Sequence, residues 1–379
     1  MNKQDWTYKK LGEICDLMAG GDVPKNRFSK EKNDIYKVPI YSNGVVNEGL
    51  YGYTDIPKIT KNSITISGRG TIGFVAKRTE PFYPAIRLIV ATPKDGIDVS
   101  YLHYCVISKH LDGNGVAIPQ LTVPMVRKVS IPIPPIGEQE RIVAELDLLQ
   151  GIIEKKKEQL KAYDQLAQSV FYTMFGDPID NPKGWETKTM SDVCASMTKG
   201  PFGSDIKKSL FVPKSKDTYK VYIQANAIEK DISLGDYYIS KDYFENKMFR
   251  FEVKPNDYII TCDGTLGKYI RLPQCIERGI ISASLLRLTL NDNINYRYFE
   301  HLWDYYILHQ QIKDIRNTAL KHLPSASKMG KTTIPLPPIS LQEEFAEKVE
   351  AIEQQKALVQ QSIEEVQTMF DCTMDKYFG

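Results

Sequence analysis

The stretch Ile131-Pro132-Ile133-Pro134-Pro135-Ile136 decides the fold, because it returns 203 residues later as Ile334-Pro335-Leu336-Pro337-Pro338-Ile339. The same interval separates Phe175-Gly176 from Phe378-Gly379, so the segment between the two marks has one length in both copies. A double proline continues neither a helix nor a central strand, so each run predicts a rigid, extended lead-in to the next element. Self-similarity of this kind is the mark of a duplicated unit. The chain is therefore predicted to contain two copies of one unit.

Two further landmarks extend the duplication towards the N-terminus. The segment 6–15 begins with Trp6 and resembles the segment 185–194, which begins with Trp185. Gly70-Thr71-Ile72-Gly73 resembles Gly264-Thr265-Leu266-Gly267. The two offsets are 179 and 194 residues, and both are smaller than 203, so the second copy carries extra loop residues. Between the landmarks the copies share little, which suggests one scaffold that presents two different surfaces.

Each proline run is followed by a long predicted helix with one apolar stripe. Ser340 with Glu343 forms a predicted capping box, and Gly137 with Glu140 is a weaker version of it. Apolar residues then alternate at spacings of four and three over about five heptads, as in a coiled-coil seam. The predicted seam comprises Ile142, Leu146, Leu149, Ile153, Leu160, Phe345, Val349, Ile352, Val359 and Ile363.

A helix of about 38 residues spans roughly 57 Å, and its apolar stripe needs a partner. We favour antiparallel pairing of the two helices within the chain, because their lengths match; a coiled coil with a second molecule is the alternative. Gly151 in the first helix costs about 1 kcal/mol relative to alanine. The sequence offers no reason for this glycine.

The regions outside the long helices mix strands and short helices. Residues 1–130 and 185–333 contain short β-type runs broken by turn residues, and short helices are predicted at 100–110 and 296–315. The fold class is therefore α+β, with two α/β modules joined by two long antiparallel helices in a pseudo-two-fold internal repeat. The predicted domains are a first module at 1–136, a first long helix at 137–176, a second module at 177–339 with a connector at 177–184, and a second long helix at 340–379.

The charge is distributed unevenly along the chain. The net charge is only +2, but 137–175 carries −2 and 341–379 carries −6, so the remainder carries +10. This excess could hold a polyanion, although helices are often acidic and loops often basic for other reasons. Glycine-rich loops in both modules carry hydrogen-bond donors, and plain tight turns are the alternative interpretation. The candidate DNA-binding residues are Lys25, Ser42, Asn43, Arg69, Thr71, Lys199, Ser204, Lys207, Lys208, Asp263, Thr265 and Lys321.

Several classes of protein are disfavoured by what the sequence lacks. The six cysteines include no C-x-x-C pair, so no metal site is expected, and we expect reduced, buried cysteines. Gly330-Lys331-Thr332 imitates the end of a phosphate-binding loop, but Ser325 stands where its first glycine should be. No base-methyltransferase tetrad, nucleophile elbow or zinc-protease motif is present, so no catalytic residue is expected. The absence of a long apolar window or an apolar leader makes a cytoplasmic location the default expectation.

Taken together, these residues and motifs point to a family. Over essentially its full length, the chain resembles the specificity subunits of type I restriction–modification systems. The resemblance rests on Trp6 and Trp185, on the Gly-Thr-Ile/Leu-Gly turns and on the proline runs. Each run is followed by a Gln-Glu pair, Gln139-Glu140 and Gln342-Glu343, and the connector 174–185 is also similar.

The resemblance implies that each module is a target-recognition domain that reads one half of a split, asymmetric DNA site. The helices would form an antiparallel coiled coil that sets the gap between the half-sites. Methyltransferase subunits, two in number, would dock on this frame with S-adenosylmethionine and methylate adenine N6. Restriction subunits would bring ATP, Mg²⁺ and DNA cleavage, and this chain itself would bind no cofactor. The family places its DNA contacts in variable loops, so the resemblance transfers no individual contact residue.

Two other hypotheses belong to different classes. A non-DNA adaptor, whose coiled coil joins two protein-binding heads, would show no salt-dependent shift of DNA. A self-contained modification enzyme would transfer methyl groups as an isolated chain, which the missing motifs disfavour. The DNA sequence, the length of the gap, the contact residues and the presence of a restriction subunit do not follow from the sequence.

Overall fold

The computed structural model describes residues 6–113, 119–309 and 322–379. The chain divides into two compact units, unit 1 with Met1–Gln159 and Leu358–Gly379, and unit 2 with Leu160–Ala357. Each unit is a globular head together with half of each long helix, and each is described by itself. The sequence predicted four domains, with boundaries at the ends of the long helices. That division stays a prediction.

Head 1 consists of short strands in three sheets. Its elements are β1 (Thr7–Lys10), α1 (Leu11–Ile14), β2 (Cys15–Ala19), β3 (Val38–Tyr41), η2 (Val46–Gly49), β4 (Leu50–Thr54), β5 (Ser63–Ile66), β6 (Val75–Arg78), β7 (Tyr83–Pro84), β8 (Ile89–Pro93), α2 (Val99–Ile107), α3 (Val123–Arg127) and β9 (Ser130–Ile133). One sheet has the order β2-β8-β5-β6, a second has the order β4-β3-β7, and β1 pairs with β9. Among these strands β3 and β7 are parallel and the other pairs are antiparallel.

Head 2 repeats this topology. Its elements are β10 (Thr187–Thr189), α5 (Met190–Val193), β11 (Cys194–Lys199), η3 (Gly203–Asp205), η4 (Lys208–Leu210), β12 (Thr218–Tyr222), α6 (Gln224–Ile228), β13 (Tyr238–Ser240), α7 (Lys241–Tyr243), η5 (Phe244–Met248), η6 (Phe249–Phe251), β14 (Tyr258–Thr261), β15 (Tyr269–Arg271), β16 (Gly279–Ile281), β17 (Leu285–Leu290), α8 (Tyr296–Leu302), η7 (Trp303–Ile307), α10 (Ala326–Met329) and β18 (Thr333–Pro335). The sheet orders are β11-β17-β14-β15, β13-β12-β16 and β10-β18, and β12 is parallel to β16. The duplication predicted from the sequence is confirmed in this strand order.

The two long helices begin directly after the double prolines. They are α4 (Ile136–Phe175) and α11 (Ile339–Phe378), each of 40 residues. The carbonyls of Pro135 and Pro338 accept hydrogen bonds from the backbone N–H groups of Gln139 and Gln342 and so close the first turns. Ser340 therefore lies inside the first turn of α11. The prediction that it caps the helix is wrong, because the proline already occupies the capping position.

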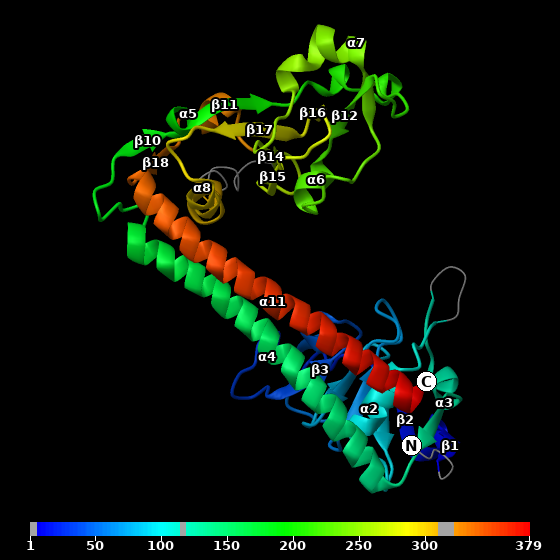
Figure 1. Cartoon of the computed structure of the whole chain (residues 1–379). Coiled ribbons are helices and arrows are strands. Elements are labelled where there is room, and N and C mark those ends of the chain that lie inside the picture. Colours follow the sequence, from blue (N-terminus) through cyan, green and yellow to red (C-terminus); the bar gives the residue numbers. More distant parts are fainter. Residues whose placement is uncertain (1–5, 114–118, 310–321) are drawn as a thin grey trace. The chain divides into compact units, whose positions relative to one another are not determined.

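The apolar stripes of the long helices are covered in both units. In unit 1 the start of α4 lies beside the end of α11, where Tyr377 donates a hydrogen bond to Glu145 (2.5 Å). In unit 2 the end of α4 lies beside the start of α11, where the rings of Phe171 and Phe345 are 5.6 Å apart (Figure 1). Of the predicted seam, the buried residues are Ile142, Leu146, Leu149, Ile153, Phe345, Ile352, Val359 and Ile363, and the half-buried ones are Leu160 and Val349.

The end of each long helix also completes the core of a head. In head 1, Met374, Tyr377 and Phe378 of α11 join the core around α2. In head 2, Phe171 and Phe175 of α4 join the core around α8. Each head is therefore packed against parts of both long helices, and for head 1 one of them, α11, is distant in the sequence.

The cysteines are not all buried as expected. Burial raises the thiol pKa to about 12 at Cys15, Cys105, Cys194 and Cys262. Cys275 and Cys372 are exposed, the first in the loop before β16 and the second on α11. The prediction of six buried cysteines is wrong for these two, because composition does not show which face of an element a residue occupies.

Candidate nucleic-acid interface

The loops that follow β2 and β5 enclose a hollow of about 710 Å³ in head 1. Its lining brings together Lys25 and Arg69, two of the predicted contact residues. Arg87, which the sequence analysis did not single out, lies in the same lining, and Phe28 and Tyr51 add aromatic rings. Guanidinium, ammonium and aromatic groups in one concavity are the groups that bind phosphates and bases.

Head 2 has a hollow of about 750 Å³ at the ends of the corresponding strands, β11 and β14. The predicted residues Lys199 and Asp263 lie in its lining. Arg250, His322 and Phe202 join them, and none of these three was predicted. The two hollows therefore occupy the same place in the repeated topology but differ in their side chains.

A glycine in each head fixes the mouth of the hollow. Gly20 and Gly200 donate equivalent backbone hydrogen bonds, to Leu88 (2.7 Å) and Leu285 (2.8 Å). A Cβ on Gly20 would lie 2.7 Å from a neighbouring backbone, and one on Gly200 would lie 1.9 Å away. Both distances are too short for a Cβ atom, so only glycine fits at these two positions.

Asn43, a predicted contact residue, has a structural role. Its side-chain amide donates to the carbonyl of Ile86 (2.6 Å), and its side-chain carbonyl accepts from the backbone N–H of Gly68 (2.8 Å). Both ends of the amide therefore tie loops together at the hollow of head 1. The neighbouring Ser42 is half-buried, and its backbone N–H donates to Gly49.

The remaining predicted residues lie outside the linings of the two hollows. The exposed ones are Thr71, Ser204, Lys207, Lys208 and Thr265. Lys321 lies outside the described residues. The structure thus brings Lys25 together with Arg69 and Lys199 together with Asp263, and it separates the others from these pairs.

The residues that sequence analysis missed come from segments without a motif. Arg87 and Arg250 lie in ordinary stretches of mixed polarity, and their neighbours in space come from other loops. Gln120, whose side-chain carbonyl accepts a hydrogen bond from Arg69 (3.0 Å), and His322 directly precede a leucine in each copy, Leu121 and Leu323. That parallel was readable from the sequence, but only once the registration of the two copies was known.

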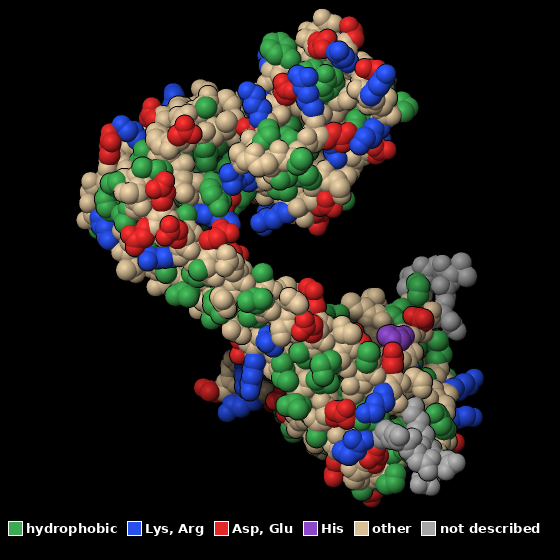
Figure 2. Space-filling model, viewed as in Figure 1, with side chains coloured by type: hydrophobic (Ala, Val, Ile, Leu, Met, Phe, Trp, Pro, Cys, Tyr) green, Lys and Arg blue, Asp and Glu red, His purple; other side chains and the backbone are tan. Residues whose placement is uncertain are grey.

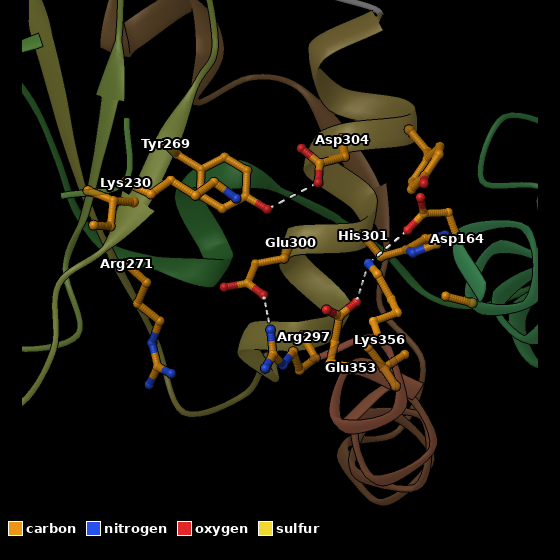
Figure 3. Close-up of a pocket in the computed structure, with 14 residues that line it drawn as sticks. Asp164, Lys230, Tyr269, Arg271, Arg297, Glu300, His301, Asp304, Glu353 and Lys356 are labelled. Carbon is orange, nitrogen blue, oxygen red and sulfur yellow. Dashed lines mark hydrogen bonds and ion pairs between the residues drawn. The ribbon is translucent and has the colours of Figure 1, made fainter. Parts of the chain in front are cut away.

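A third hollow, of about 350 Å³ in unit 2, is lined by charged residues of α8, α4 and α11. Figure 3 shows Lys356 between Asp164 (2.7 Å) and Glu353 (3.0 Å). Arg297 lies 3.1 Å from Glu300 in the same view. Arg297 also lies 2.8 Å from Glu350 of α11, so ion pairs join head 2 to the long helices and the hollow is a joint within unit 2, a poor candidate for a polyanion.

Burial shifts the pKa values of several groups at this joint. It raises the carboxyl pKa of Glu300 and Asp304 and lowers the pKa of the His301 imidazole to about 4. The His301 ring stacks on Phe171 with centroids 4.2 Å apart, and its buried Nε2 atom has no hydrogen-bond partner within the described part of the chain. His301 is therefore neutral near pH 7 and acts as a packing group.

Surface charge alone does not locate an interface. On the visible face of each head, Lys and Arg side chains are interspersed with Asp and Glu (Figure 2). Within the described ranges, no cluster of His, Cys, Asp and Glu could hold a metal ion. None of the helices described is both long and apolar enough to span a bilayer.

Comparison with known sequences gives consistent matches. Residues 3–162 and 182–368 match the family model described as the type I restriction modification DNA specificity domain. A putative type I specificity subunit from Mycoplasma pneumoniae is 38% identical over 173 residues, which cover 42% of this chain and 51% of that protein. The specificity subunit of type I restriction enzyme MjaIX from Methanocaldococcus jannaschii is 27% identical over 224 residues, which cover 50% of this chain and 52% of that protein. The matches span about half the length of these relatives.

Solved structures share the fold. The S subunit of a type I restriction–modification system from M. genitalium aligns with a TM-score of 0.56 at 16% identity and covers 99% of this chain and 96% of that one. A chain from a structural study of assembly and conformational transition of the type I R-M system aligns with a TM-score of 0.58 at 17% identity, covering 99% and 97%. At these identities the likeness concerns the fold alone.

Proposed function

The chain belongs to the type I restriction–modification DNA specificity family, and from this premise we propose that it reads a bipartite, asymmetric DNA site, one half with each head. The observation that carries the proposal is the hollow at the ends of β2 and β5, which recurs at β11 and β14 with different side chains. A duplicated scaffold with unlike linings suits two different half-sites. The alternative of a non-DNA adaptor finds no support in the family match.

The lining chemistry supports duplex DNA as the ligand. Lys25 and Arg87 in head 1, and Lys199 and Arg250 in head 2, supply the cations that phosphates require. Arg69 and Asp263 add groups that can hydrogen-bond to base edges. In this proposal the cations position the heads on the duplex and the other groups read the sequence.

The long helices have two proposed roles. As an antiparallel coiled coil, α4 and α11 hold the heads at a fixed separation and so set the gap between the half-sites. Their exposed faces offer a docking site for methyltransferase subunits, two in number, and restriction subunits would join the same assembly. The proposed domains are those expected from the sequence, with the connector at 177–184 leading into the second module.

Chemistry is assigned to the partners in this proposal. The chain contributes no catalytic residue, and S-adenosylmethionine, ATP and Mg²⁺ belong to the methyltransferase and restriction subunits. The site of action is the cytoplasm, where the DNA and these partners are found.

The proposal is tested with the chain in complex with its methyltransferase partner. Random duplexes are selected by binding and sequenced, and methylated sites are mapped in cells with and without the gene. We expect one site made of two defined parts with an undefined gap. Exchange of head 2 for that of another family member should change one part only. The proposal would be contradicted if the chain selected a continuous site, or if exchange of head 2 left the selected sequence unchanged.

A further inference from the structure

Arg69 and Asp263 occupy the same position in the two heads. Each directly precedes a Gly-Thr-Ile/Leu-Gly turn that is closed by the same backbone hydrogen bond. This bond runs from Gly73 to Ser67 (3.0 Å) in head 1 and from Gly267 to Thr261 (2.9 Å) in head 2. The repeat therefore places an arginine and an aspartate, with opposite charges, at one structural site.

The partners of these two residues are also equivalent. The backbone N–H of Leu121 donates to Gly68 (2.9 Å), and that of Leu323 donates to Cys262 (2.8 Å), so the two leucines are in register. The residue before each leucine, Gln120 or His322, reaches the residue at the repeated position.

The hydrogen bonds within the two pairs have opposite sense. Arg69 Nη2 donates to the side-chain carbonyl of Gln120 (3.0 Å). In head 2 the Nδ1 atom of His322 lies 2.5 Å from Oδ1 of Asp263. Each head thus holds one polar pair at one place, with its own arrangement of donors and acceptors.

The pair in head 1 presents donors to a ligand. The guanidinium of Arg69 has only N–H groups, and the carbonyl of Gln120 is already occupied, so its amide N–H groups remain. Guanine offers two acceptors, O6 and N7, at its major-groove edge, and arginine binds them with two parallel hydrogen bonds.

The pair in head 2 presents acceptors. The carboxyl pKa of Asp263 is lowered: partial burial opposes the shift, but hydrogen bonds from His322 and Ser284 outweigh it. With Asp263 ionised, its Oδ1 atom accepts the hydrogen bond from Nδ1 of His322, and the carboxylate keeps further lone pairs as acceptors for a ligand. Carboxylate acceptors match an exocyclic amino group, N6 of adenine or N4 of cytosine.

The exposure of the two pairs leaves them accessible. Arg69 is exposed, and the side chains of Asp263 and His322 are 32% and 50% exposed. A carboxylate would repel phosphate, yet Asp263 lies in a hollow with Lys199 and Arg250. A carboxylate in this hollow weakens phosphate binding, and a role in reading a base explains its presence.

We infer that positions 69 and 263 are one base-reading position, duplicated with inverted hydrogen-bonding character. Head 1 uses Arg69 and Gln120 to select guanine, and head 2 uses Asp263 and His322 to select a base with an amino group. The inference rests on the proposed function and extends it to the class of base that each head accepts.

The test uses selection from random duplexes by the complex with its methyltransferase partner. Arg69→Ala should relax the selection at one G·C pair of one half-site, by roughly 5- to 140-fold, as expected for the loss of one bidentate contact. The other half-site and the gap should not change. Lys9→Ala is the control for the loss of one positive charge, because Lys9 is exposed on β1 of the same head and outside the hollow.

An exchange of pairs provides the second measurement. Arg69→Asp with Gln120→His should change guanine to adenine or cytosine at that same position. Asp263→Arg with His322→Gln should do the reverse in the other half-site. If Arg69→Ala weakens binding to all sequences equally and reduces its salt dependence, Arg69 is a phosphate contact and the inference is overturned, while the two-part site selected by the unaltered chain still stands. If the unaltered chain selects no two-part site, the proposed function fails instead.

Discussion

Replacement of Gln139 by methionine should loosen head 1 and leave head 2 unchanged. Gln139 is fully buried at the start of α4. Its amide nitrogen donates to the carbonyls of Pro134 (2.9 Å) and Gly96 (3.1 Å), and its carbonyl accepts from the backbone N–H of Asp98 (2.9 Å). Asp98 in turn caps α2. One side chain therefore joins the proline run, the loop before α2 and the long helix.

Methionine fills a similar volume but leaves these three backbone groups without their partner. Each buried group left unpaired costs about 1–3 kcal/mol. Gly96 is exposed, so water can replace the bond to its carbonyl. The N–H of Asp98 and the carbonyl of Pro134 remain unpaired, so we expect a loss of about 2–6 kcal/mol in the free energy of unfolding of head 1.

The repeat supplies a matched variant in head 2. Gln342 makes the same contacts, with Pro337 (2.7 Å), Asn293 (3.4 Å) and Asn295 (2.8 Å). Gln342→Met should loosen head 2 to a similar extent and leave head 1 unchanged. Hydrogen exchange, read separately in peptides from α2 and α8 at increasing urea, measures each head by itself.

The neighbouring exposed glutamates provide controls. Glu140→Met and Glu343→Met should each change stability by less than about 0.5 kcal/mol, as is usual for surface substitutions. A cost below that value for Gln139→Met, or equal loosening of both heads, would refute the reasoning.

Three further predictions concern the joint and the long helices. Folding lowers the pKa of His301 from 6.5 to about 4; the unfolded chain therefore binds the proton more readily, and stability present above pH 6.5 is lost as the pH falls towards 4. His301→Phe, which keeps the stacking on Phe171, should reduce that acid loss in unit 2 by up to about 2 kcal/mol in urea unfolding at pH 5 and 7. Gly151→Ala should raise the thermal stability of unit 1 by about 1 kcal/mol, because a Cβ there meets nothing within 4 Å. One extra heptad after Gln159 and another after Ala357 lengthen both helices by about 10.5 Å and should widen the selected gap by up to about three base pairs.

Each of these has an outcome that contradicts it. An equal acid loss in His301→Phe would mean that other groups, such as Glu300, dominate the pH dependence. A destabilised Gly151→Ala variant would show that this glycine has a role in packing or docking. An unchanged gap after the paired insertions would remove the long helices from the setting of the spacing, and insertion in one helix alone serves as the mismatched control.

The duplication and the positions of its landmarks followed from the sequence alone. The proline runs, the equal lengths of the segments after them and the spacing of apolar residues all act locally along the chain. Local rules such as proline sterics and helical periodicity are therefore enough to predict them. The same rules placed the cap of the second helix two residues late, at Ser340, because the capping-box pattern does not show that Pro338 already closes the first turn.

The three-dimensional structure was needed to show which loop residues come together. Gln120 is 51 residues from Arg69 and His322 is 59 residues from Asp263, in loops without periodicity. It also showed that the side chain of Asn43 holds loops together, and that the end of α11 completes the core of head 1, which is distant in the sequence. Contacts between distant segments depend on how side chains pack and on how buried hydrogen-bonding groups find partners over the whole head. Local sequence patterns do not predict these contacts.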